Sequence, residues 1–479
     1  MPRSFLSHAA AYGLAAVLVQ AAGFVLLPLY TRCLGPEDYG VLEIVTRLSE
    51  TASTLLLIGG FCQALFALHN QAEDEAQRRR AVCAAYLLLA GFCGVGGGLL
   101  LWLAPALLPS LDSWTLRLGI LTILLEPFSL VPLSLMQART QSLAYAGVVL
   151  GQFLVRVGLA VALVALLGMG AAGALASVAI TGAIFGLALS VIELRRGVAL
   201  PAWADVRAML SFALPLVPSG LCFFLLHHGD RFFLLRHASS AEVGVYGLGY
   251  RLAMMAAVFG FAPLFKVWSA RMYEEARRPD RARAFGAAFT RILALYGLAG
   301  LGVSLFAAEG VALLAGEAFA AAASFVPLVV LACGCQSAAT LLDTGLFIAR
   351  RPWRKLAATV AATAVTLVLY AVLIPPHGAL GAAWATLGGF AFLMLATFAL
   401  AQPVFPVEYE WGRLAGLASL FGLLALAASV QPWGVPGKLL LCAAAPSLMM
   451  AALATDEERA SVFRWWPTAR PVIAGGETR

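Results

Sequence analysis

Long apolar runs, separated by short polar connections, follow one another through the chain and limit the folds open to it. An α-helix of about 20 apolar residues spans a bilayer because it satisfies its own backbone hydrogen bonds. Hydropathy gives fourteen candidate spans, near residues 8–29, 40–68, 81–104, 116–137, 144–167, 170–192, 209–235, 243–268, 285–307, 323–348, 356–375, 378–400, 412–430 and 435–453. The chain is 61% hydrophobic and 12% charged, against about 45–50% and about 25% in soluble domains. These values predict an all-α polytopic membrane protein.

The distribution of positive charge indicates the topology. With the N-terminus in the cytoplasm, 24 of the 32 lysines and arginines fall on cytoplasmic connections or ends, and 5 fall outside. Positive residues accumulate on the cytoplasmic side of membrane proteins. The bias therefore supports cytoplasmic N- and C-termini and an even number of spans. It also accounts for most of the net charge of +7, so we expect no nucleic-acid partner.

An internal repeat organises the spans into two lobes. The segment 40–48 matches the segment 244–252 at a shift of 204 residues, with Gly-Val near the start and Arg-Leu at the end. Two further matches join 138–139 to 349–350 and 170–174 to 378–382, at shifts of 211 and 208. Six spans separate the copies, so both copies insert with the same orientation.

The repeat divides the chain into four parts. We predict an N-terminal lobe of spans 1–6 at residues 1–195 and a C-terminal lobe of spans 7–12 at 196–405. Two additional spans follow at 406–455, and a cytoplasmic tail at 456–479. Two parallel-repeat six-helix lobes around a cavity are the architecture of an alternating-access transporter.

Charged residues inside the second span are the first candidate site. Glu43, Arg47 and Glu50 are spaced i, i+4 and i+7, so a helix places them on one face. Charges within a span normally face a protein interior or an aqueous cavity. Because Arg251 occupies the repeat position of Arg47, we predict that the two arginines face one central cavity. Alternatively, Arg47 pairs with Glu43 and only stabilises packing, and Arg251 pairs across the lobes with Glu43 or Glu50.

Two further groups of charges are candidates for gating or ion coupling. Glu126 and Arg156 have no charged counterpart in the second lobe and are expected either to couple an ion or to form a buried structural pair. The other group is predicted at the outer ends of the lobes, where cross-lobe salt bridges would form a gate, with solvated helix ends as the alternative. Its members are Arg32, Asp38, Asp230 and Arg231.

Several functional classes find no support. The eight cysteines are scattered, and Cys333-Gly-Cys335 has no second ligand pair nearby, so no metal site is expected. No GxxxxGK[ST] loop is present, which argues against ATP hydrolysis. The outer connections are short and carry no catalytic constellation. We therefore expect no catalytic residues, no cofactor and no enzymatic activity.

Motifs near the start of each lobe resemble a known family. The pattern is similar to the N-terminal signature of polysaccharide and O-antigen flippases of the multidrug/oligosaccharidyl-lipid/polysaccharide exporter superfamily, over about residues 5–455. The residues that carry it are Leu27-Pro28-Leu29, Arg32, Leu34-Gly35-Pro36, Asp38-Tyr39-Gly40, Phe212-Ala213-Leu214-Pro215-Leu216, Asp230-Arg231 and Val243-Gly244-Val245-Tyr246.

The resemblance implies a function. It implies movement of undecaprenyl-pyrophosphate-linked oligosaccharide from the cytoplasmic to the periplasmic leaflet of the bacterial inner membrane, for O-antigen, lipopolysaccharide or exopolysaccharide synthesis. Membrane lipids, a polysaccharide polymerase and glycosyltransferases would be its partners. Without ATP hydrolysis, energy would have to come from an ion gradient, with H+ or Na+ as the coupling ion, from the membrane potential, or from consumption of the product outside. Spans 13 and 14 are similar to the additional pair of spans in the related peptidoglycan-precursor flippases.

Arginine suits such a cargo, because its guanidinium stays charged and binds phosphate oxygens in pairs. On this reading Arg47 and Arg251 grip the headgroup, with Glu43 and Glu50 beside them. The first alternative is a cation-coupled multidrug exporter of the same superfamily, which would bind organic cations through acids and aromatic rings. Paired arginines disfavour that cargo. A membrane glycosyl-transfer enzyme is a second alternative, but it leaves the parallel repeat unexplained.

Overall fold

We describe the protein from a computed structural model. It describes residues 26–55, 58–72, 74–107, 112–139, 141–214, 216–430 and 434–453, which are helical with no strand among them. Within these ranges nine helices are long and apolar enough to cross a membrane, and two shorter apolar helices cover Trp411–Leu424 and Val435–Met449. The all-α membrane fold is thus confirmed. Most of the first predicted span, 8–29, and the tail, 456–479, lie outside the described residues.

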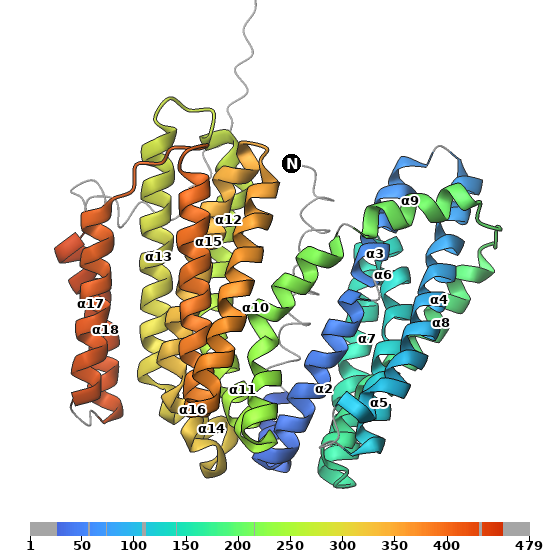
Figure 1. Cartoon of the computed structure of the whole chain (residues 1–479), viewed down its shortest axis with the longest axis horizontal. Coiled ribbons are helices and arrows are strands. Elements are labelled where there is room, and N and C mark those ends of the chain that lie inside the picture. The colour runs from blue at the N-terminus through green and yellow to red at the C-terminus, as the bar shows by residue number, and fades with distance from the viewer. Residues whose placement is uncertain are drawn as a thin grey trace, which may run out of the picture. The chain divides into compact units, whose positions relative to one another are not determined.

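Figure 1 shows the helices in order along the chain. They are α2 (Pro36–Leu55), α3 (Ile58–Gln71), α4 (Glu75–Leu107), α5 (Ser113–Leu125), α6 (Pro127–Ala138), α7 (Ser142–Ala160), the π-helix η1 (Val161–Leu166), α8 (Gly170–Arg195), α9 (Trp203–Ala213), α10 (Leu216–His237), α11 (Ser240–Met255), the π-helix η2 (Ala256–Phe261), α12 (Ala262–Glu275), α13 (Arg281–Leu305), α14 (Ala307–Ala315), the 3-10 helix η3 (Glu317–Ser324), α15 (Val326–Ile348), α16 (Pro352–Ala401), α17 (Trp411–Val430) and α18 (Val435–Leu453). Residues 26–33, before α2, are also helical.

Proline and glycine explain where the helices differ from the predicted spans. The predicted span 116–137 is divided into α5 and α6 at Glu126, because Pro127 has no N–H to continue the helix. The predicted spans 356–375 and 378–400 form the single run α16, which is broken at Gly378 with φ 54°. The short helices α14 and η3 fall in a connection for which no helix was predicted.

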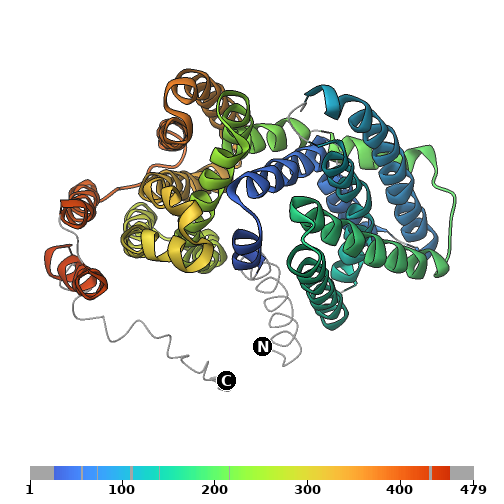
Figure 2. The ribbon, with the colours of Figure 1, turned by 90° about the horizontal axis from the view of Figure 1, so that it is seen from below.

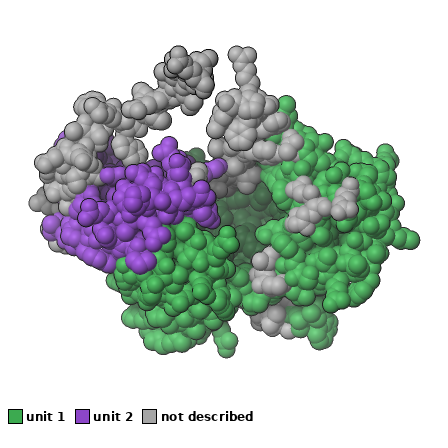
Figure 3. Space-filling view, turned by 90° about the horizontal axis from the view of Figure 1, so that it is seen from above, with its two compact units in different colours: residues 1–255, 307–405 green, residues 256–306, 406–479 purple. Residues whose placement is uncertain are grey.

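The described chain forms two compact units, coloured in Figure 3. Unit 1 contains residues 1–255 and 307–405, and unit 2 contains 256–306 and 406–479. This division differs from the lobes inferred from the repeat. In unit 2, the additional helices α17 and α18 pack on α13 through Leu301, Leu305, Leu424 and Ala445. The C-terminal pair therefore shares its hydrophobic core with a helix assigned to the second lobe.

One large core cluster in unit 1 joins α3, α4 and α6. It includes Phe61, Leu65, Leu89 and Leu135, all buried. Met209 of α9 belongs to the same cluster, although the sequence division places residue 196 onward in the second lobe. The amphipathic α9 thus packs with helices of the first lobe. Its first turn is closed by a hydrogen bond from the Ala202 N–H to the Asp205 carboxylate, 2.9 Å.

Two glycines with positive φ occupy equivalent places in the repeat. Gly170 (φ 59°) opens α8, and Gly378 (φ 54°) breaks α16. Each faces a carboxylate: Asp38 Oδ2 lies 3.2 Å from the position of a Cβ on Gly170, and Glu242 accepts a 2.7 Å hydrogen bond from the N–H of Ala379. A carboxylate is favourable at a helix N-terminus. Asp38 and Glu242 are themselves 204 residues apart, so both copies use the same device.

Candidate functional site

The site lies where α2 crosses α11, which are adjacent in unit 1 (Figures 1 and 2). Two glycines allow their backbones to touch. A Cβ on Gly40 would overlap the Ser240 carbonyl oxygen, and a Cβ on Gly244 would overlap the Pro36 carbonyl oxygen. These two glycines begin the matched segments of the repeat. The close contact brings Glu43 and Arg47, one and two turns further along α2, near Arg251, two turns further along α11.

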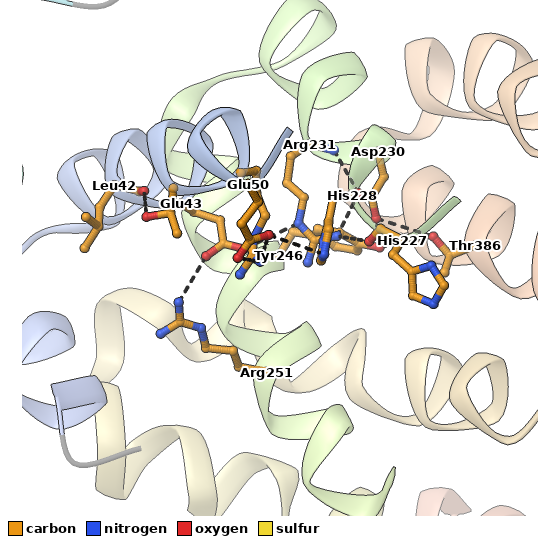
Figure 4. A network of polar contacts seen from close by, with 12 residues as sticks. Leu42, Glu43, Glu50, His227, His228, Asp230, Arg231, Tyr246, Arg251 and Thr386 are labelled. Carbon is orange, nitrogen blue, oxygen red and sulfur yellow. Dashed lines mark hydrogen bonds and ion pairs between the residues drawn. The ribbon is translucent and has the colours of Figure 1, made fainter. Parts of the chain in front are cut away.

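Glu43 is the centre of the charged cluster at this crossing (Figure 4). Its residue is 2% exposed, and its carboxylate pairs with three arginines. The distances are 3.0 Å to Arg47 Nε, 3.4 Å to Arg251 Nη2 and 3.5 Å to Arg231 Nε. Arg47 is on the same helix, whereas Arg231 lies on α10 and Arg251 on α11. One carboxylate therefore connects α2 to both α10 and α11.

The predicted central residues are thus brought together. Arg47 also pairs with Glu50 at 2.6 Å, and its side chain is 14% exposed. The Arg251 side chain is 29% exposed and lies 5.8 Å from the centre of the Tyr39 ring. Both arginines pair with Glu43, as the pairing alternative predicts, and their place at a central cavity stays a prediction.

Asp230 and Arg231 are placed differently from the outer gate that the sequence suggested. Both are buried, at 0% and 1% exposed, inside the cluster around Glu43. Arg231 Nη1 donates to Asp230 Oδ1 at 2.7 Å, and the Tyr246 hydroxyl donates to Asp230 Oδ2 at 2.7 Å. The Arg231 guanidinium stacks over the Tyr250 ring, 4.2 Å from its centre. The hydrogen bonds and ring contacts of Asp230 and Arg231 therefore lie in the interior of the protein.

Arg32 and Asp38 lie elsewhere. The Arg32 guanidinium donates to the Leu313 carbonyl oxygen at 3.0 Å, and it is exposed. Asp38 faces Gly170, as described above. The structure therefore does not bring these two residues to Asp230 and Arg231 in the part of the chain that it describes. Their role in a gate stays a prediction.

Glu126 and Arg156 do not form an ion pair among the described residues. Glu126 is exposed at the break between α5 and α6, and the Nε of Arg156 is buried without a hydrogen-bond partner in the described part of the chain. The pairing on which an ion-coupling role was based is absent from this geometry. The coupling role of the two residues is untested.

Sequence reasoning missed the aromatic and hydroxyl groups of the site. Tyr246 and Tyr250 are one helical turn apart, immediately before Arg251, and both face Arg231. The Thr386 hydroxyl, on α16, is 3.4 Å from Asp230 Oδ2. The i, i+4 spacing of these tyrosines, next to an arginine within a span, was the sequence pattern that could have indicated them. No local pattern pointed to Thr386.

Beside the ends of α6 and α8, Arg139 and Glu193 form a structural ion pair. Arg139, after α6, binds Glu193 of α8 with two hydrogen bonds of 2.8 and 2.5 Å. Those hydrogen bonds raise the pKa of Arg139 above its usual value. Nearby, burial lowers the pKa of His69, with Arg139 and Arg78 adding to the effect. This end of unit 1 therefore holds a fixed cation and a histidine that favours its neutral form.

Comparison with known proteins now identifies the family. The profile described as "Polysaccharide biosynthesis protein" matches residues 5–269. The chain belongs to this family. The family expected from the motifs is confirmed. Comparison with curated proteins gives no match.

Solved structures of transporters share the fold of this family member. One is titled "Lipid II flippase MurJ, inward closed conformation", with a TM-score of 0.74 and 8% identity over 93% of this chain and 99% of that chain. A multidrug resistance MATE transporter in an inward-facing conformation has a TM-score of 0.59 and 16% identity, over 85% and 95%. A MOP superfamily transporter from Pyrococcus furiosus, described as having a binding pocket of reverse polarity, has a TM-score of 0.55 and 14% identity. The match covers 84% of this chain and 95% of that chain.

Proposed function

We propose that this protein is a flippase for a lipid-linked oligosaccharide whose headgroup is a diphosphate, carried across the bacterial inner membrane by alternating access. One observation supports this most: the repeat-related arginines Arg47 and Arg251 both converge on a partly exposed cluster beside Glu43. Membership of the polysaccharide biosynthesis family and the fold shared with a lipid II flippase add support.

The chemistry of the cluster favours an anionic cargo. Arginine keeps its charge in a site of low dielectric and offers paired N–H donors to phosphate oxygens. Arg251 and Arg47 are the accessible members, whereas Arg231 is enclosed. We place the diphosphate between Arg47 and Arg251. Figure 3 shows a hollow in the visible face of unit 1.

The remaining elements of the proposal follow the family. The carrier lipid is undecaprenyl, the movement is from the cytoplasmic to the periplasmic leaflet, and both termini are cytoplasmic because of the Lys/Arg bias. An H+ or Na+ gradient or the membrane potential supplies energy. A polysaccharide polymerase and glycosyltransferases are its partners in this proposal.

The second candidate is a cation-coupled drug exporter, since MATE transporters share the fold. Such a pocket would attract organic cations through uncompensated acids. Here each of the three carboxylates of the charged cluster has an arginine partner: Glu43 with Arg251, Glu50 with Arg47 and Asp230 with Arg231. The cluster therefore offers a cation no free carboxylate among these three.

A thermal-stability titration of the purified full-length protein separates the two. Undecaprenyl-diphosphate oligosaccharide should raise the melting temperature, whereas a panel of cationic dyes should not. Arg47→Ala and Arg251→Ala should each remove the shift. Arg278→Ala is the control, because this arginine pairs with Glu275 and Asp280 and its side chain is 54% exposed. Stabilisation by the dyes, with lipid binding unchanged in the arginine variants, would favour the exporter.

A further inference from the structure

The crossing of α2 and α11 is symmetric in its glycines and arginines but asymmetric in its acid. The shift of 204 residues relates Gly40 to Gly244 and Arg47 to Arg251, yet it relates Glu43 to Gly247. A Cβ on Gly247 would lie 3.1 Å from the Cγ of Glu43. The absence of a side chain at 247 thus makes the space that the Glu43 side chain fills. A glutamate at position 247 would also bring a second carboxylate close to Glu43, and the two negative charges would repel each other.

Charge balance at the crossing bears on how an anion binds there. The cluster contains three arginines, Arg47, Arg231 and Arg251, and three carboxylates, Glu43, Glu50 and Asp230. A diphosphate therefore does not meet a set of unpaired cations. It gains the whole guanidinium of an arginine only by taking that arginine away from a carboxylate.

Geometry singles out Arg251 as the arginine that is released. Its side chain is the most exposed of the three, at 29%, and its contact with Glu43 is long, at 3.4 Å. Arg47 has a second carboxylate at 2.6 Å, and Arg231 has one at 2.7 Å and is enclosed. The contact between Glu43 and Arg251 also joins α2 to α11. Its loss would loosen the crossing.

We propose that Glu43 is the resident anion of the arginine cluster, and that it is a positioning residue which competes with the diphosphate for Arg251. Binding of the headgroup breaks the tie between Glu43 and Arg251 and so frees α2 from α11. Occupancy of the site is thereby linked to separation of the two lobes. This inference rests on the proposed function and specifies how the cargo acts on the crossing.

The test uses farnesyl diphosphate as a lipid diphosphate and inorganic pyrophosphate as the lipid-free anion, each titrated calorimetrically into the full-length protein. Glu43→Gln should bind farnesyl diphosphate about tenfold more tightly than wild type, within the usual range of coupling between sites. A variant that is only damaged would bind more weakly. Glu50→Gln is the control, since it removes the same charge but leaves Glu43 and Arg251 in contact. Its gain should be smaller.

Amide hydrogen exchange provides the second readout. Farnesyl diphosphate should raise exchange at residues 36–44 and 240–250 in wild type. In Glu43→Gln, exchange there should already be high without ligand. Gly247→Ala keeps every charge and displaces the Glu43 side chain, so it should shift affinity and exchange in the same direction as Glu43→Gln. If Glu43→Gln does not fold, Gly247→Ala tests by itself whether Glu43 competes with the diphosphate for Arg251.

The outcomes separate the inference from the proposed function. If wild type binds farnesyl diphosphate and both Glu43→Gln and Gly247→Ala bind it no more tightly than Glu50→Gln, the competition is refuted while the flippase stands. If wild type binds neither the lipid diphosphate nor pyrophosphate, both are refuted. A gain seen equally with pyrophosphate and the lipid supports competition at the phosphates, and a gain with pyrophosphate alone contradicts it.

Discussion

The helices α2 and α11 carry a glycine and an arginine at equivalent positions, but the two arginines have different surroundings. Arg47 is held by two carboxylates of its own helix, Glu43 and Glu50. Arg251 faces the ring of Tyr39 and a carboxylate from the other helix. Repetition therefore supplies equivalent positions, and the neighbouring residues make one arginine rigid and leave the other available.

The largest effect should distinguish a structural arginine from a binding one. Arg231→Met removes the cation that pairs with the buried carboxylate of Asp230, which typically costs about 3–5 kcal/mol. Arg251→Met should cost only about 1 kcal/mol, since its ion pair is long and partly exposed. Thermal unfolding in detergent measures both. Lipid binding should show the reverse order among the variants that fold, and equal stabilities would contradict the distinction.

A smaller effect should test whether the crossing is symmetric in its packing. Gly40→Ala and Gly244→Ala each place a methyl group against a backbone carbonyl of the opposite helix. Each should destabilise the protein by about 3 kcal/mol, at the upper end of ordinary overpacking. Gly91→Ala is the control, because nothing lies within 4 Å of its Cβ position. Unequal losses at 40 and 244 would show that one helix yields more readily than the other.

The smallest effect concerns the two glycines with positive φ. An alanine at Gly170 or Gly378 is strained by about 1–2 kcal/mol in the left-handed region. The loss should be greater at 378, where a Cβ would overlap the Glu242 carboxylate, than at 170, where Asp38 lies 3.2 Å away. Chemical unfolding of each variant measures the difference. A larger loss at 170 would contradict this comparison.

Much of the fold could be read from the apolar runs because lipid forces each to be helical. The clustering of the in-span charges Glu43, Arg47 and Arg251 was also predictable, since a charge within a span needs a polar surrounding. The ends of the helices were harder to predict from the sequence. Pro127 and Gly378 interrupt helices, but whether a proline breaks, kinks or merely starts a helix depends on its neighbours in space, as the placement of Pro327 at the beginning of α15 illustrates.

The sequence by itself determined the all-α membrane class, the repeat and the family, because hydropathy and glycine or arginine at fixed spacing act locally along the chain. Only the tertiary structure decided the partners of each charge. Asp230 and Arg231, near the end of an apolar run, became part of the buried cluster because α10 packs beside α2. Glu43 acquired two cations from other helices for the same reason. An ion pair between helices depends on how their backbones approach, and here Gly40 and Gly244 set that approach.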